Sequence, residues 1–461
     1  MHDLSEGADE EIIRSCACTD IHHPLDLNPS VWNSLPGELL ERVFACLPLA
    51  SLLKFRAVSR SWKAAPLQPL FRSLRACVMI PETWLIMLGR PRAVAQSRST
   101  SSVRTAPPSS LIAFALNLEF SKAVALRHAF LPFPPANFGC ISYCATAGGL
   151  ICYHYHMGFS TGSHERTSVS LWVGNPFTKE WKCLPPMIGS FPLNFPLRGL
   201  AGMVILDSAV QHRGVQHYKI IVRTHSRCAA WGSGMMTEEY DSHTNAWKVT
   251  ATGNVPSDHR IEQVLHCSGS LYFLTWQMRD GIYVYNLTKQ SWSCILPPKR
   301  YQFTSPHMVE CCGQLILVSG VGKHYTVNKR KGAVRRLHAR TTGIKIWQLV
   351  QQEKDPSCTN AFSEAPTTTS TTVVDQKVPT MSARRSWSFL SWMPEELVQE
   401  FVTGVHFHCT SIRNLIYLTN SISMLTFNVV ARMWQRVIIT QPPLMVLQDF
   451  VSFVPKLEAS P

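Results

Sequence analysis

Long apolar runs are missing from this sequence of 461 residues, and none approaches the length of a membrane span. The first residues, MHDLSEGADEE, are acidic and lack an apolar stretch, so we expect no secretory signal. The 15 cysteines lie mostly inside apolar segments and are interpreted as reduced, buried thiols. These absences favour a cytoplasmic or nuclear protein with no membrane partner.

Acidic residues are also few. Lys and Arg number 44 against 30 Asp and Glu, and the formal net charge of +14 favours acidic partners. The basic residues are scattered and no aromatic–basic reader motif accompanies them, so a nucleic acid is not the favoured partner. A hydrophobic content of 45% is ordinary for a globular protein, and the length allows a small module plus one large domain.

Catalytic motifs are absent too: the sequence has no Gly-rich phosphate loop, Ser elbow or metal-hydrolase motif. The strongest metal candidate is the run CYHYH at 152–156. In a strand, Cys152, His154 and His156 would face one way, but the sequence places no further ligand beside them. A strand with satisfied histidines is therefore favoured, and we expect no metal, no cofactor and no catalytic residue.

Residues 31–65 are interpreted as three short helices that follow a flexible leader at 1–30. Pro36 suits the first turn of a helix, and Glu38 in that turn complements the helix dipole. Apolar residues then repeat at three- and four-residue spacing, as Leu35, Leu39, Val43, Phe44 and Leu47.

So small a helical module cannot bury this apolar surface alone. The surplus is either a docking surface for another protein or a cap that packs on the later part of the same chain. The physics of the sequence leaves both alternatives open.

The module resembles an F-box, which favours the docking surface. The family's pattern is matched in order and spacing by Leu35-Pro36, Glu38-Leu39-Leu40, Val43-Phe44, Leu47 and Val58-Ser59-Arg60-Ser61-Trp62. The resemblance implies an F-box at 31–75 that binds a Skp-type adaptor and, through it, a cullin. The adaptor-binding residues that it implies are Leu35, Pro36, Leu39, Leu40, Val43, Phe44, Leu47 and Leu49.

Residues 76–461 consist mostly of short apolar runs separated by Gly, Pro and Asn clusters, a pattern typical of strands. An Asn or Asp precedes a Trp by six residues in four places: Asn175 and Trp181, Asp241 and Trp247, Asn286 and Trp292, Asn428 and Trp434. Each pair predicts a hairpin. The Asn or Asp bonds to the turn backbone, and the Trp opens the next strand and packs between neighbouring sheets.

Repeated sheets of this kind bury their faces by stacking around an axis. About six units predict a fold that is mainly β, with a small all-α F-box followed by a kelch-like β-propeller of six or seven blades. A β-sandwich or an irregular all-β domain is the alternative. The segment 447–455 is expected to close the ring in the first blade, and 89–110 and 353–385 are expected to be disordered excursions.

The order of the repeat resembles plant F-box/kelch proteins, through GGLIC at 148–152, NPFTKEWKCLPP at 175–186 and CSGSLY at 267–272. It is especially similar to the branch that contains the leaf-curling regulator and Unusual Floral Organs. The resemblance implies a non-catalytic receptor that brings an unknown target protein to a ubiquitin ligase. A non-degradative scaffold or cofactor for a regulatory protein stays open. The basic run 329–340 is interpreted as a solvated loop between strands, and a nuclear-import signal or a contact with an acidic partner is the alternative.

Overall fold

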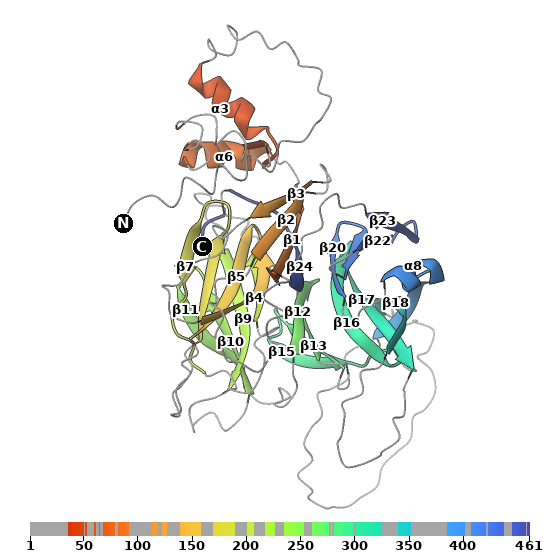
Figure 1. The fold of residues 1–461 in the computed structure, drawn as a ribbon. Helices are drawn as coiled ribbons and strands as arrows, with labels where there is room; N and C mark the ends of the chain where they lie inside the picture. Colours follow the sequence, from red (N-terminus) through yellow and green to blue (C-terminus); the bar gives the residue numbers. More distant parts are fainter. Residues whose placement is uncertain are drawn as a thin grey trace, which may run out of the picture.

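The computed structural model describes the segments that carry the fold, and Figure 1 draws the other residues as a thin grey trace. The described residues are 36–49, 51–52, 60, 64, 68–78, 82–91, 112–117, 122–126, 139–157, 169–189, 201–206, 217–225, 235–252, 261–275, 278, 281–298, 301–323, 340–351, 385–401, 407–420, 423–437, 445–457 and 459–461.

The described strands form six four-stranded sheets, which we number 1 to 6 along the chain. Sheet 1 has the order β24-β1-β2-β3, with bounds Met445–Phe453, Trp84–Pro91, Ile112–Asn117 and Lys122–Leu126. Sheet 2 comprises β4 to β7, Gly139–Ala147, Leu150–Met157, Val169–Asn175 and Glu180–Cys183. Sheet 3 comprises β8 to β11, Ala201–Leu206, His217–His225, Met235–Asp241 and Ala246–Thr252.

The second half of the chain repeats this plan. Sheet 4 comprises β12 to β15, Ile261–Cys267, Ser270–Thr275, Ile282–Asn286 and Ser291–Ile295. Sheet 5 comprises β16 to β19, Phe303–Cys311, Gln314–Lys323, Arg340–Gln351 and Arg385–Trp392. Sheet 6 comprises β20 to β23, His408–Ile412, Leu415–Thr419, Met424–Asn428 and Met433–Val437.

The sheets are arranged in a closed ring. One strand of each sheet contacts its counterpart in the next sheet, in the circular order β4, β8, β12, β16, β20, β24 and back to β4. The ring is closed within sheet 1, because β24 pairs antiparallel with β1 from Trp84 opposite Phe453 to Pro91 opposite Met445. The predicted closure by the C-terminal strand is therefore confirmed. It removes two sheet edges that would otherwise be open.

All four predicted Asn/Asp–Trp hairpins are confirmed. In each, the Trp lies opposite the residue before the Asn or Asp: Gly174 and Trp181, Tyr240 and Trp247, Tyr285 and Trp292, Phe427 and Trp434. The polar residue bonds to its turn, as where Asn428 Oδ1 accepts hydrogen bonds from the backbone N–H groups of Val430 and Ala431 at 3.0 and 2.9 Å. In sheet 1 the corresponding register places Leu116 opposite Ala123, so the Trp position is Ala there.

The Trp side chains join neighbouring sheets. Trp247 of sheet 3 donates from Nε1 to the Pro185 carbonyl, at the end of sheet 2, at 2.8 Å. Trp292 of sheet 4 donates to Thr237 Oγ1 of sheet 3 at 2.9 Å. In sheet 5 the same place is taken by Trp387, which donates to the Leu296 carbonyl at 2.8 Å. The sequence spacing missed Trp387 because β18 and β19 are separated by a long insertion.

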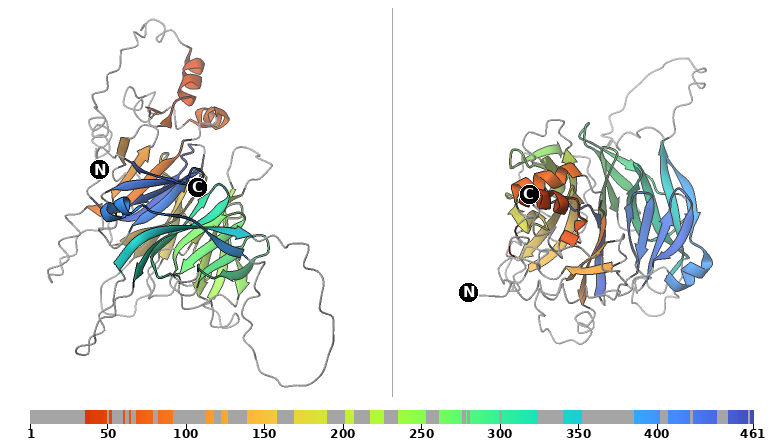
Figure 2. Two further views of the ribbon diagram at one scale, coloured as in Figure 1. Left: turned by 90° about the vertical axis from the view of Figure 1, so that its right-hand side faces the viewer. Right: turned by 90° about the horizontal axis from the view of Figure 1, so that it is seen from above.

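Two described helices, α3 (Gly37–Ala45) and α6 (Pro69–Val78), form what we call the helical head. The head lies over sheets 1 and 2 (Figures 1 and 2). The first predicted helix is confirmed, with Pro36 at its N-cap. The helix α6 was not predicted, although Leu70, Phe71 and Leu74 give it an apolar side.

A further helix, α8 (Glu395–Phe401), follows β19 and lies beside β18 (Figure 1). The sequence also indicates that residues 343–350 and 387–397 are two halves of one unit, and β18 pairs with β19 accordingly. The second half changes structure at Pro394, whose carbonyl accepts hydrogen bonds from the N–H groups of Leu397 and Val398 at 3.1 and 3.0 Å. The strand therefore ends at Trp392, before the proline.

Candidate functional site

The exposed side of α3 carries the residues that are free to meet another protein. Leu39 and Val43 lie one turn apart and are 45% and 37% exposed. Pro36 precedes them at the start of the helix and is also exposed. Residues four apart share a helix face, so this side of α3 presents an apolar surface to solvent.

Two other predicted adaptor residues face inward. Phe44 and Leu49 are 6% and 2% exposed and belong to the core between the head and the propeller. Leu40 and Leu47 are partly buried and pack against the same core. Leu35 lies outside the described residues. The structure therefore combines the two alternatives left open above, since one side of α3 packs on its own chain and the other side does not.

The core beneath the head is shared among segments far apart in the sequence. Phe44, Leu52 and Phe71 of the head region pack with Trp84 of β1. The same cluster includes Ile151 and Tyr153 of β5, Phe177 after β6, Phe453 of β24 and Leu457 beyond it. Because both ends of the described chain contribute, the head is attached where the ring closes.

A buried carboxylate adds polar contacts to this junction. Glu82 is 2% exposed, and its Oε1 accepts hydrogen bonds from the Leu49 backbone N–H at 2.6 Å and from Arg75 Nη2 at 3.0 Å. Its Oε2 accepts a hydrogen bond from Trp84 Nε1 at 3.3 Å. Arg75 also donates to the Ala45 and Leu47 carbonyls at the end of α3, at 3.1 and 2.5 Å. These contacts connect α3, α6 and β1 to one another.

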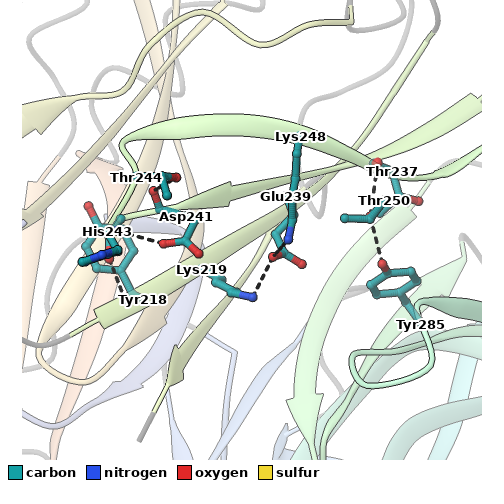
Figure 3. Close-up of polar contacts among 11 residues, drawn as sticks. Tyr218, Lys219, Thr237, Glu239, Asp241, His243, Thr244, Lys248, Thr250 and Tyr285 are labelled. Carbon is teal, nitrogen blue, oxygen red and sulfur yellow. Dashed lines mark hydrogen bonds and ion pairs between the residues drawn. The ribbon is translucent and has the colours of Figure 1, made fainter. Parts of the chain in front are cut away.

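The second polar cluster lies in sheet 3 and faces sheet 4 (Figure 3). Glu239 is 3% exposed and pairs with Lys219 at 2.7 Å and Lys248 at 3.1 Å. Beside it, Tyr285 of sheet 4 donates to Thr250 Oγ1 at 2.9 Å. Burial raises the pKa of Tyr285, so the phenol stays protonated at neutral pH. The hydrogen bond between Tyr285 and Thr250 links sheet 4 to sheet 3.

The CYHYH run at 152–156 lies in β5, and its side chains alternate as expected. Cys152 is buried in the core between sheets 2 and 3, whereas Tyr153 belongs to the core beneath the head. His154 is 2% exposed. Within the described part of the chain, no group of three or more His, Cys, Asp and Glu residues could hold a metal ion.

Several predicted features cannot be placed. The leader at 1–30, the basic run up to residue 339 and most of both excursions lie outside the described residues. In the helices that the structure does describe, no segment is both long and apolar enough to cross a membrane.

The ring of sheets and its helical head define a β-propeller protein with an F-box-type head. The F-box domain model matches residues 32–73, and the KIB1-4 beta-propeller model matches residues 117–421. The chain belongs to the KIB1-4 beta-propeller family, carries an F-box domain, and has plant F-box/kelch-repeat proteins as relatives.

Three curated relatives illustrate this. F-box only protein 6 of Arabidopsis thaliana is 24% identical over 316 residues, 66% of this chain and 56% of that protein. An F-box/kelch-repeat protein of the same plant is 25% identical over 259 residues, 55% of this chain and 52% of that protein. Protein ABERRANT PANICLE ORGANIZATION 1 of Oryza sativa subsp. japonica is 25% identical, over 70% and 67% of the two chains. The chain thus spans little more than half of the first two relatives.

Among solved structures, the GH93 alpha-L-arabinofuranosidase of Fusarium graminearum aligns with a TM-score of 0.34 and 12% identity. The alignment covers 68% of this chain and 85% of that one.

Proposed function

We propose that this protein is the substrate-recognition subunit of a Skp–cullin–F-box ubiquitin ligase. The observation that carries the proposal is the two-sided α3 helix of the F-box domain. One side is fixed to the propeller through Phe44 and Leu49, and the other exposes Leu39 and Val43 to a partner. In this role, the subunit is non-catalytic and needs no cofactor, since it contributes proximity between the target and the ubiquitin-conjugating enzyme.

The proposed division of the chain is a leader at 1–30, an F-box at 31–75 and a kelch-like propeller at 76–461. The six sheets would be its six blades, the lower of the two expected numbers. The propeller would bind the target protein in the cytoplasm or nucleus. The head would bind a Skp-type adaptor and, through it, a cullin.

The burial pattern narrows the proposed adaptor surface. Pro36, Leu39 and Val43 form its centre because they are exposed, and Leu40 lies at its edge because it is partly buried. Leu35 stays in the proposal from the sequence. Phe44, Leu47 and Leu49 support the helix from below, which makes α3 a rigid surface. Rigid surfaces lose less conformational entropy on binding.

Direct binding to a purified Skp-type adaptor tests the proposal. The double variant Leu39→Ala with Val43→Ala should weaken adaptor binding by about thirtyfold or more, since central apolar contacts are worth about 2 kcal/mol or more. The matched control is Val430→Ala with Met433→Ala, a second exposed apolar pair, at the outer hairpin of sheet 6. Equal binding by both double variants would contradict the proposal.

Degradative and scaffold roles are separated by a second measurement. A protein bound by the propeller should rise in level when the proteasome is inhibited, and this rise should be absent in cells that carry the Leu39→Ala, Val43→Ala variant. An unchanged level would favour the scaffold role.

A further inference from the structure

A buried lysine in sheet 5 is surrounded by exposed aromatic rings. Lys345 of β18 is 9% exposed, and its Nζ lies 3.9 Å from the ring centre of Tyr301 and 4.1 Å from that of Trp392. Phe389 contributes a third ring at 5.8 Å. All three aromatic residues are exposed: Tyr301 by 39%, Trp392 by 44% and Phe389 by 51%. We call these four residues the lysine–aromatic site.

The ammonium group of Lys345 has no anionic partner within the described chain, where its only contacts are the three rings. Two other cations differ in this respect, since Arg75 pairs with Glu82 and Lys219 with Glu239. Burying an ammonium without a counter-charge is costly, and ring faces offset only part of that cost. The Nζ atom of Lys345 is also not closed off from solvent. The site therefore holds an accessible, uncompensated positive charge.

The local sequence builds this arrangement. Trp392 lies opposite Lys345 across the β18–β19 pair. Its indole extends over Gly343, where an added Cβ would lie 2.7 Å from Trp392 Cζ2. Any other residue at 343 would displace the ring. Tyr301 also packs against Trp347, with ring centres 5.4 Å apart.

We propose that the lysine–aromatic site binds a segment of the target protein in which an Asp or Glu lies next to an apolar side chain. The carboxylate pairs with Lys345 Nζ, and the apolar side chain packs on Trp392 and Phe389. Exposed Tyr and Trp are typical of binding hot spots, and a net charge of +14 favours acidic partners. A cationic segment does not fit, because Lys345 already occupies the ring faces. This inference rests on the proposed role of the propeller as the target-binding part.

The position of the site agrees with that role. Around the ring, sheet 5 is two sheets away from sheet 1 and three from sheet 2, the two sheets over which the head lies. In Figure 1, β18 lies well away from α3 and α6. A bound segment at Lys345 therefore leaves the exposed side of α3 free for the adaptor.

Two synthetic peptide pools and the full chain test the proposal by fluorescence anisotropy. Both pools have random apolar residues around a fixed central position, which is Glu in one and Gln in the other. The unchanged protein should bind the Glu pool about tenfold more tightly, because a charge-assisted hydrogen bond contributes enough for that factor. The variant Lys345→Gln should lose this preference. The matched control Lys289→Gln, which removes an exposed lysine from the β14–β15 turn, should keep it.

A second variant keeps the test decisive if Lys345→Gln does not fold. Trp392 is 44% exposed and its replacement in Trp392→Ala should leave the fold intact while it weakens binding of both pools several-fold. The proposal is overturned if the unchanged protein does not bind the Glu pool more tightly than the Gln pool, or if Trp392→Ala binds both pools as well as the unchanged protein does.

Adaptor binding is measured on the same samples. If Lys345→Gln loses the preference for the Glu pool but still binds the adaptor, the inference about the lysine–aromatic site is supported. This result does not depend on whether the protein acts in a ligase. Absence of adaptor binding in the unchanged protein with intact peptide preference refutes only the ligase role.

Discussion

A single carboxylate, Glu82, joins three elements that are separate in the sequence. It accepts hydrogen bonds from Leu49, Arg75 and Trp84 while only 2% exposed. Removing one member of a buried pair leaves the other charge without compensation, which costs more than the pair contributes. A second pair, between Arg72 of α6 and Glu180 of β7 at 2.8 Å, is less buried, with side chains 17% and 39% exposed, so the penalty is smaller there.

This contrast gives a matched experiment on α6. The variant Glu82→Gln should lower the free energy of unfolding by about 3 kcal/mol, because Arg75 stays buried without its counter-charge. The control Glu180→Gln should lower it by less, because this pair lies closer to solvent. Urea unfolding followed by tryptophan fluorescence measures both. Equal losses would mean that burial does not distinguish the two pairs.

Buried thiols make the stability depend on alkaline pH. Burial raises the pKa of Cys409, and burial together with Cys312 raises the pKa of Cys311 to about 12. A thiol in the unfolded chain titrates near pH 8.5. Above that pH the unfolded state has released protons that the folded state keeps, so the free energy of unfolding falls by about 1.4 kcal/mol per pH unit for each such thiol.

The test is urea unfolding between pH 8 and 10.5 under reducing conditions. Cys409→Ala should make the decline with pH less steep, whereas Cys294→Ala, at an exposed position, should leave it unchanged. Identical declines in the unchanged protein and in Cys409→Ala would show that this thiol ionises equally easily in both states.

At the scale of elements, the hairpins were predictable because their information is local. An Asn or Asp that closes a strand and a Trp six residues later fix the turn and the register together. The packing of the head was not predictable. Phe44 and Val43 both belong to the apolar stripe in the sequence. Only the fold shows that Phe44 packs against the propeller and that Val43 is exposed to solvent. For the lysine–aromatic site, the sequence indicates that residues 343–350 and 387–397 belong to one unit, but only the fold shows the register that places Lys345 opposite Trp392.

The hairpin of sheet 2 differs from the others in the residue opposite its Trp, because this Trp packs toward the helical head. In sheets 3, 4 and 6 the residue opposite the Trp is aromatic, with ring centres 4.9 to 5.3 Å apart. In sheet 2 it is Gly174, where an added Cβ would lie 2.2 Å from Trp181 Cε3. Trp181 instead packs toward Tyr153 and the core beneath the head.

Gly174→Ala should therefore lower the free energy of unfolding by about 1 to 3 kcal/mol, the usual cost of overpacking. Gly37→Ala is the control, because an added Cβ at Gly37 has no neighbour within 4 Å. That variant should be neutral or slightly stabilising, since Ala favours the helix. Calorimetry distinguishes the two, and a neutral Gly174→Ala would show that Trp181 can move aside freely.

At the scale of the whole molecule, the two ends of the chain depend on each other. The last strand closes the ring by pairing with β1, and Leu457 just beyond it is 4% exposed in the core that holds the head. Asn175 fixes this tail, since its Nδ2 donates to the Lys456 and Ala459 carbonyls at 2.6 and 2.9 Å. The head is therefore held by the same residues that complete the propeller.

Hydrogen exchange tests this dependence, because proteins open locally in units that share contacts. Leu457→Ala removes a buried side chain at a cost of about 2 to 5 kcal/mol and should speed amide exchange in α3 and α6 by tenfold or more. Leu274→Ala removes an equally buried leucine from sheet 4 and should speed exchange there while α3 and α6 stay protected. If both variants accelerate the head equally, the head opens only when the whole ring unfolds, and the tail has no special part in holding it.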